Sequence, residues 1–205
     1  MKYASITLLT CAIGLFCSPE ARSQCANDTS IYAFSHGDKD YELVRVNKTW
    51  SEAAACAVER GGLLAEIDDS TEQAIINNEL SQNAGIIPTN TKAPDGGNGA
   101  YVWLGGHDIK TEGEWLWDGN GDSTGTQFWQ GTASGKSVNN AYTNWGNEPD
   151  NYNNQDALGL SLDGWPLGNT GEWNDVDIDN KLYFLIEKPK ETQTSVKPLP
   201  HAAPL

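Results

Sequence analysis

Hydrophobic and polar positions along this chain of 205 residues predict two helices first and a series of short strands afterwards. Residues Trp50–Arg60 have the composition of a helix: Thr49 or Ser51 is available as its cap, and Gly61 and Gly62 end it. Helices followed by many short strands are typical of an α+β fold. We therefore expect an α+β domain with its helices in the first half.

A second helix is predicted for Ser70–Leu80, capped by Ser70 or by Asp69. Its apolar positions Ala74, Ile75 and Leu80 are expected to face the core. The predicted strands are Tyr41–Val46, Leu63–Ile67, Tyr101–Leu104, Glu114–Trp117, Ala157–Leu162, Gly171–Val176 and Leu182–Glu187.

Two segments rich in turn-forming residues interrupt this series. Gly85–Ala100 carries glycines and prolines and predicts a surface loop. Gly119–Asn140, rich in Gly, Ser, Thr and Asn, predicts a long loop anchored by Phe128 and Trp129.

The two ends of the chain differ in composition from the rest. Residues 1–23 combine a basic start, an apolar run and a small-residue pattern, which predicts a signal peptide and a secreted protein. The apolar run is too short to span a bilayer, so no membrane insertion is expected. Residues 24–31 form an N-terminal segment, 32–188 the domain, and 189–205 a Pro-rich tail expected to be disordered.

Four cysteines are present, and Cys11 and Cys17 fall in the predicted signal peptide. In an oxidising compartment the remaining Cys25 and Cys56 can form a disulfide. A buried free Cys56 beside a loose Cys25 is the alternative, and the residues alone leave both open.

Charge and motif searches exclude several functions. A formal net charge of -15 argues against nucleic acid and anionic membrane surfaces as partners. The histidines are isolated, so no His-based metal cluster is expected. Gly121–Gly125 matches a nucleophile-elbow pattern but lies in a glycine-rich loop, and Asp118–Asp122 only resembles the start of an EF-hand loop. We expect that the protein is not an enzyme. The sequence neither predicts nor excludes a homo-oligomer.

One stretch, Asn144–Val176, concentrates oxygen-bearing side chains. It holds six Asp/Glu residues, many Asn and Gln, and three tryptophans. Calcium takes six to eight oxygen ligands from carboxylates, amides and carbonyls, so this composition suits a Ca²⁺ site. Glu148 and Asp150 flank Pro149, and a cis bond before that proline would aim both carboxylates the same way. The alternative is a solvated Asn/Asp loop.

Seven pieces of the chain, in order from about Tyr32 to Lys188, resemble the C-type lectin domain, a calcium-dependent carbohydrate-recognition fold. The pieces are Thr49–Ile67, Trp103–Asp108, Glu112–Gly119, Asn144-Trp145, Glu148–Asp150, Trp173–Asp175 and Tyr183–Glu187. Any one piece is weak evidence, but seven in order are specific.

This resemblance implies a calcium site, which would also be the carbohydrate site, at Glu148, Asp150, Gln155, Asn174 and Asp175. A second calcium site would fall on Asp108, Glu112, Asn151 and Asp156, where Asn151 replaces a common acid. Glu148 with Asp150 is neither the mannose-type nor the galactose-type pair, so the glycan preference stays undecided.

The chain departs from the family at its cysteines. The resemblance implies disulfides joining position 56 to 186 and 157 to 178, but three of these positions are Ala157, Ile178 and Ile186. A core repacked around the apolar residues is expected. The sequence thus predicts a secreted, calcium-dependent carbohydrate-binding protein. The alternative is a module of the same fold that binds a protein or another non-sugar ligand.

Overall fold

The computed structural model describes residues 25–190, which fold into two α-helices, eleven strands and three short helical turns. The helices are α1 (Trp50–Glu59) and α2 (Ser70–Asn78). The strands are β1 (Ile31–His36), β2 (Lys39–Lys48), β3 (Leu63–Leu64), β4 (Lys92–Ala93), β5 (Gly99–His107), β6 (Glu114–Trp117), β7 (Thr126–Gln130), β8 (Lys136–Ser137), β9 (Ala157–Ser161), β10 (Trp173–Val176) and β11 (Leu182–Pro189).

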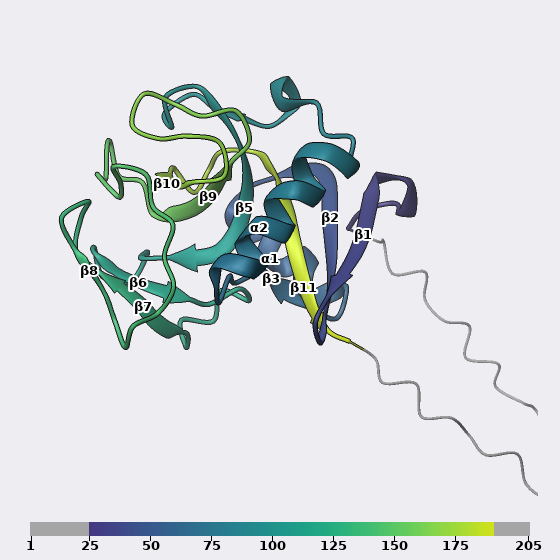
Figure 1. The fold of residues 1–205 in the computed structure, drawn as a ribbon, viewed down its shortest axis with the longest axis horizontal. Coiled ribbons are helices and arrows are strands. Elements are labelled where there is room, and N and C mark those ends of the chain that lie inside the picture. The colour runs from purple at the N-terminus through teal and green to yellow at the C-terminus, as the bar shows by residue number, and fades with distance from the viewer. Residues whose placement is uncertain (1–24, 191–205) are drawn as a thin grey trace, which may run out of the picture.

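The last strand, β11, lies beside β2 near the start of the chain, and β1 flanks β2 on its other side, as Figure 1 shows. The main order is β1-β2-β11-β5-β6-β7-β8, and β11 runs parallel to β5. Strand β9 pairs with β5, and β10 pairs with β9, which forms a branch of the sheet. The expected α+β fold is confirmed, and this branch carries the long loops at the end of the molecule away from β1.

Helix α1 begins as predicted and is capped by Thr49 rather than Ser51. The Thr49 hydroxyl accepts from the backbone N–H of Glu52, and the Glu52 carboxylate accepts from the backbone N–H of Thr49. This reciprocal capping box satisfies two donors that the first turn leaves without partners. Trp50 then packs inward and donates its indole N–H to the carbonyl of Leu104 at 2.8 Å.

Helix α2 has a different buried face from the predicted one. Asp69 caps it by accepting from two backbone N–H groups. Leu80 is buried as predicted but lies just after α2, in the short helical turn Glu79–Asn83, whereas Ala74 is exposed, Ile75 is only partly buried and Ile76 is buried instead. Polar Glu72 and Gln73 take the inner positions instead. The apolar pattern predicted the wrong face because both polar side chains have buried hydrogen-bond partners, Tyr41 for Glu72 and Trp173 for Gln73.

Both predicted loops contain strands. Segment 85–100 includes β4 and the start of β5, and segment 119–140 includes β7 and β8. Phe128 on β7 is fully buried, stacked on Trp117 with ring centroids 4.3 Å apart, so its anchoring role is confirmed. The predicted strand Leu63–Ile67 is shorter, with only β3 paired in the sheet.

The core forms two clusters on either side of the sheet. One is built around Trp173, Trp117 and Phe128, whose rings meet edge to face or stacked, and it also contains Trp115. Such aromatic pairs contribute about 0.5–1.5 kcal/mol each beyond their burial. The second cluster contains the buried face of α1, including Cys56, and the three positions where the family's cysteines are replaced, namely Ala157, Ile178 and Ile186. The expected repacking is therefore present.

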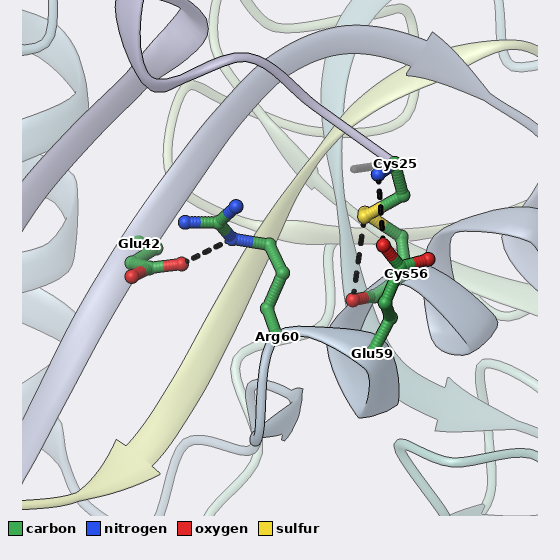
Figure 2. The surroundings of a disulfide bond; sticks show 5 residues. All are labelled: Cys25, Glu42, Cys56, Glu59 and Arg60. Atoms are coloured by element: carbon green, nitrogen blue, oxygen red, sulfur yellow. Dashed lines mark hydrogen bonds and ion pairs between the residues drawn. A yellow bond between two sulfur atoms is a disulfide. The ribbon is translucent and has the colours of Figure 1, made fainter. Parts of the chain in front are cut away.

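A disulfide joins Cys25 to Cys56 and ties the start of the described chain to α1, as Figure 2 shows. The backbone N–H of Cys25 also donates to Glu59 on the same helix. A crosslink closing a loop of about 30 residues stabilises by about 3–4 kcal/mol in the chain-entropy model. Of the two alternatives left open by the sequence, the bridge is correct.

Strand β11 continues through Pro189, one residue past the expected domain boundary, and Lys190 still donates its backbone N–H to Asp38. The predicted signal peptide and the rest of the predicted tail lie outside the described residues. Within residues 25–190, no helix is long and apolar enough to cross a membrane.

Candidate functional site

The polar stretch 144–176 is folded back on itself by backbone pairing around Trp173. The N–H of Trp173 donates to the carbonyl of Asn144, and the N–H of Gly146 donates to the carbonyl of Trp173. The Trp173 indole donates to Gln73 of α2 at 2.7 Å, which gives the buried Gln73 its partner. This pairing brings the residues after Gly146 beside the end of β10.

Glu148 reaches the site across a cis peptide bond to Pro149. Its carboxylate is buried, with 3% of the residue exposed. Oε1 accepts from the indole N–H of Trp165 at 2.9 Å, whereas the buried Oε2 has no hydrogen-bond partner among the described residues. A buried oxygen without a partner costs about 1–3 kcal/mol, so Oε2 is a candidate to bind a ligand.

Three carboxylates converge at this point. Glu148, Asp150 and Asp175 each offer an oxygen within 4.8 Å of the others. Asp175 is fully buried on β10 and accepts from the backbone N–H groups of Asp150 and Asn151, at 3.3 and 2.7 Å. These bonds fix the loop after the cis proline against the strand. Glu148 and Asp175, 27 positions apart, therefore share one site.

The loop after Asp150 uses asparagine to turn tightly. Asn151, Asn153 and Asn154 all have positive φ, a region that asparagine tolerates better than most residues. Asp150 accepts from the backbone N–H of Tyr152 at 2.9 Å and stays exposed. These turns bring Gln155 back toward the carboxylates.

Two amides complete the set predicted from the sequence. Gln155 and Asn174 are each 2% exposed. The Gln155 Nε2 donates to Asp95 at 3.0 Å, and the Asn174 Nδ2 donates to the Tyr101 hydroxyl at 2.9 Å. The Asn174 Oδ1 is buried without a hydrogen-bond partner within the described chain. The structure thus brings all five predicted residues into one region.

The convergence of negative groups changes their acidity. Burial, together with the neighbouring Asp175 and Asp150, raises the pKa of Glu148 to about 8, although the Trp165 hydrogen bond opposes the shift. Burial also raises the pKa of Asp175 to about 6 against its three backbone hydrogen bonds. A divalent cation in their midst would relieve both costs, because it supplies the missing positive charge.

The second predicted set lies next to the first but converges less. Asp108 is buried, with Oδ2 accepting from the N–H of Gly113 and Oδ1 unpaired in the described part of the chain. Burial raises its pKa to about 8, assisted by Glu112, Asp156 and Asp175. Asn151 donates to Glu112 at 2.6 Å and accepts from the Gln155 N–H, so its side chain already has protein partners.

A hollow of about 200 Å³ opens beside the carboxylates. Its walls include Asp95, Gly97, Glu148, Asp150, Tyr152, Gln155, Trp165, Pro166, Leu167 and Asn174. Tyr152 is 59% exposed and Leu167 39%, so the hollow pairs an acidic floor with an apolar rim. A larger hollow, of about 570 Å³, lies near Glu42, whose carboxylate pairs with Arg60, as Figure 2 shows, and with Lys188.

Three residues of this region were not predicted from the sequence to belong to the site: Asp95, Tyr101 and Trp165. Each contacts one of the predicted residues through a side-chain hydrogen bond. Asp95 lies in a segment that was predicted as a surface loop. The one local signal for a role in the site is its position as a charged residue before the glycines of an uncharged turn.

The two motifs set aside in the sequence act as turns. Asp118 accepts from the backbone N–H of Ser123 at 2.7 Å and lies 3.1 Å from His107. Ser123 has a positive φ and is followed by strand β7 rather than by a helix, unlike a nucleophile elbow.

An α+β domain whose last strand pairs with β2 near the start of the chain, and whose long loops gather carboxylates and amides over a branch of the sheet, defines a binding module of the lectin type. Residues 46–188 match the family model of the lectin C-type domain. The chain belongs to the C-type lectin domain family, whose members are carbohydrate-binding modules rather than enzymes, as the sequence predicted.

Among its relatives, lectin BRA-3 of Megabalanus rosa is 28% identical over 142 residues, 68% of this chain and 65% of that protein. The galactose-specific lectin nattectin of Thalassophryne nattereri is 27% identical over 122 residues, 58% of this chain and 64% of nattectin. The mouse scavenger receptor C-type lectin carbohydrate-recognition domain matches the fold with a TM-score of 0.53 and 22% identity, over 78% of this chain and 95% of that one.

Proposed function

We propose that this protein binds carbohydrate through a Ca²⁺ ion held by its long loops. The side-chain ligands would be Glu148, Asp150, Gln155, Asn174 and Asp175, with the carbonyl of Asp175 as a sixth oxygen. Two vicinal sugar hydroxyls would bring the total to eight, the upper end of the range for calcium. Bound calcium supplies positive charge and coordination places for hydroxyl oxygens.

One observation carries this proposal: Glu148 Oε2 and Asn174 Oδ1 are buried, and neither has a hydrogen-bond partner within residues 25–190. Both residues line the hollow that Asp150 shares. Oxygens are the donors that calcium selects, and three carboxylates over-compensate its charge of +2. The donor set therefore fits a hard divalent cation.

The sugar would be held by hydrogen bonds as well as by the ion. Glu148 and Asp150 are acceptors for hydroxyl protons, and charge-assisted bonds of this kind are about twice as strong as neutral ones. The exposed Tyr152 and Leu167 offer apolar surface beside them. Nattectin is described as galactose-specific, but the Glu148/Asp150 pair leaves mannose-type and galactose-type glycans both open for this chain.

A second, weaker calcium ion is proposed at Asp108, Glu112, Asn151 and Asp156. The unpaired Asp108 Oδ1 supports it. The Asn151 side chain would first have to release Glu112 and the Gln155 N–H. We therefore expect the first site to fill at lower calcium concentration than the second.

We also propose that the protein is secreted. The predicted signal peptide at residues 1–23 supports this, and so does the Cys25–Cys56 disulfide, because such bonds persist in oxidising compartments. Calcium is abundant outside cells, which suits an affinity of about 10⁻⁴–10⁻³ M for extracellular modules.

A glycan array probed in Ca²⁺ and again in EDTA tests the proposed function. Calcium-dependent signals on a defined set of glycans are expected, and EDTA should remove them. Calcium uptake without any glycan signal would favour the alternative, a module of this family that binds a protein or another non-sugar ligand. Absence of calcium uptake by calorimetry would contradict both the ion and the sugar.

A further inference from the structure

Asp95 lies beside the proposed calcium site although it is far from it in sequence. Its Oδ2 accepts from Gln155 Nε2 at 3.0 Å and from the backbone N–H of Asp177 at 2.8 Å, and its Oδ1 accepts from the Asn180 side chain. Asp95 does not belong to the group of carboxylates that converge within 4.8 Å. Of the five predicted calcium ligands, Gln155 is the one to which Asp95 hydrogen-bonds within residues 25–190, so we expect its effect on the ion to run through Gln155.

The contact between Asp95 and Gln155 decides which end of the amide faces the site. A carboxylate only accepts hydrogen bonds, so the NH₂ group of Gln155, not its oxygen, must point toward Asp95. The backbone N–H of Gln155 is held by Asn151 at 2.8 Å, which fixes the other end of the residue. Oε1 is consequently turned away from Asp95.

The hydrogen bonds of the Tyr101 hydroxyl fix the orientation of the Asn174 amide in the same way. The Tyr101 hydroxyl has one proton, which it donates to the carbonyl of Gly96 at 2.7 Å. It must then accept from Asn174 Nδ2, which leaves Asn174 Oδ1 as the buried oxygen without a partner. Asp95 and Gly96 are adjacent, so one short segment turns the nitrogen ends of both amides outward from the ion position.

Close packing of this segment requires glycine at position 96. A Cβ there would lie 2.6 Å from Cγ1 of Val176 and 3.2 Å from the Asn174 Nδ2. A bulkier residue would push the carbonyl of Gly96 away from Tyr101 and Asp95 away from Gln155. The segment Asp95-Gly96 is therefore tightly packed against the residues of the site.

We propose that Asp95 is a positioning residue that presents Gln155 to the cation as an oxygen donor. A glutamine without such a partner is free to rotate its amide, and in half of its orientations it would offer hydrogen atoms to a positive ion. By holding Nε2, Asp95 removes that alternative before the ion arrives. The inference rests on the proposed calcium function and assigns a residue outside the predicted ligand set.

A double-mutant cycle on the full chain tests the inference with CaCl₂ as the titrant in calorimetry. Asp95→Ala should weaken calcium binding about tenfold, the usual cost of losing a partner that orients a ligand. Gln155→Ala should weaken binding at least as much. In the Gln155→Ala background, adding Asp95→Ala should change the dissociation constant by less than about threefold, because Asp95 acts through Gln155.

Two further variants separate orientation from folding and from charge. Asn180→Ala removes the other side-chain donor to Asp95 but leaves the Gln155 contact, so calcium affinity should stay within about threefold of the unmutated chain. Asp95→Asn removes the charge but keeps an oxygen that can accept from Gln155, so it should weaken calcium binding clearly less than Asp95→Ala does. Melting in EDTA reports whether each variant is folded, and Asp95→Leu replaces Asp95→Ala in the cycle if the latter unfolds.

The outcomes that overturn the inference are distinct from those that overturn the calcium site. If the unmutated chain takes up no calcium, both fail. If it binds calcium and Asp95 variants bind equally well, only this inference fails. It also fails if Asp95→Ala weakens binding equally with and without Gln155, since that result assigns Asp95 a general charge or folding effect.

Discussion

Two acidic clusters in this protein differ in what neutralises them. The site cluster is Glu148, Asp150 and Asp175. The lysine cluster is Asp68, Glu72 and Glu187, arranged around Lys39 at 2.8, 3.0 and 3.1 Å. Both bring three carboxylates together on an otherwise packed domain. Only the second contains a positive side chain of its own.

The consequences for the carboxylates are different. In the lysine cluster Glu72, although buried, accepts from Lys39, from the Tyr41 hydroxyl and from the backbone N–H of Asp68. In the site cluster Glu148 keeps an unpartnered oxygen and a raised pKa. In the lysine cluster, Glu187 Oε2 also lacks a hydrogen-bond partner within the described residues and burial raises the pKa of Glu187, but Lys39 Nζ lies 3.1 Å away. No cationic side chain pairs with Glu148 within residues 25–190, which supports the proposal that a bound ion supplies the positive charge there.

The largest effect should come from removing charge in the site cluster. Asp175→Asn keeps the shape of the side chain but takes away the most buried of the three charges. We expect calcium affinity to fall more than about 100-fold, glycan binding to disappear, and the stabilisation by calcium to vanish by mass action. Calorimetry and melting with and without calcium measure these effects.

Asp179→Asn serves as the matched control for this variant, because Asp179 is an exposed aspartate only four positions further along the chain. It should bind calcium like the unmutated chain. Equal calcium affinity in Asp175→Asn and Asp179→Asn would remove Asp175 from the site.

The lysine cluster should respond in the opposite way, through folding rather than through calcium. Lys39→Met leaves Glu72 and Glu187 without their cation. Breaking a buried ion pair costs about 3–5 kcal/mol, and since the Lys39 side chain is 24% exposed we expect about 2 kcal/mol. Urea unfolding in EDTA measures the loss. Calcium affinity of the folded variant should be unchanged; a drop there would mean that the two clusters are coupled.

The sequence predicted the proposed calcium ligands better than it predicted the residues that hydrogen-bond to them. Glu148, Asp150 and Asp175 lie in short motifs, so a resemblance placed them without a structure. Asp95 and Trp165 contact these residues from segments whose sequences carry no motif. Partners that are distant in the chain depend on how loops fold onto each other, which local patterns do not encode.

The fold shows the same limit. Strand β6 was predicted with its observed bounds because alternation and turns are local signals. Helix α2 was given the wrong core face because Gln73 and Glu72 are polar yet buried. Gln73 is satisfied by Trp173, 100 positions away, and Glu72 by Tyr41 and Lys39. Polar residues with distant partners defeat any rule that reads polarity as exposure.

A smaller effect is expected from the one donor that Glu148 does have. Trp165→Phe removes the indole N–H at Oε1 and keeps an aromatic ring near Tyr101. Loss of this orienting bond should weaken calcium binding about fivefold, close to 1 kcal/mol. Trp129→Phe is the control, since its indole donates to the carbonyl of Gly131, outside the site. Identical calcium affinities in the two variants would show that Trp165 does not orient Glu148.

The smallest effect concerns pH and Glu66, which adjoins the lysine cluster. Burial, with the nearby Asp68 and Glu187, raises the pKa of Glu66 to about 7 despite Lys39. Because the folded pKa exceeds the unfolded value of about 4.3, the folded state holds this proton more tightly, and its contribution to stability is lost as pH rises from about 5 to 8. Glu148 and Asp175, also raised, act in the same direction when calcium is absent.

Bound calcium should therefore cancel the pH dependence of folding stability that comes from the site cluster. The part that comes from Glu66 should remain. In saturating calcium, the melting temperature of Glu66→Gln relative to the unmutated chain should rise by about 2–3 °C between pH 5 and 8. Glu114→Gln, a change at an exposed glutamate on β6, should show no such trend. If the Glu66→Gln difference stays flat across this range, Glu66 is not the titrating group, and the lysine cluster is neutralised more completely than its geometry implies.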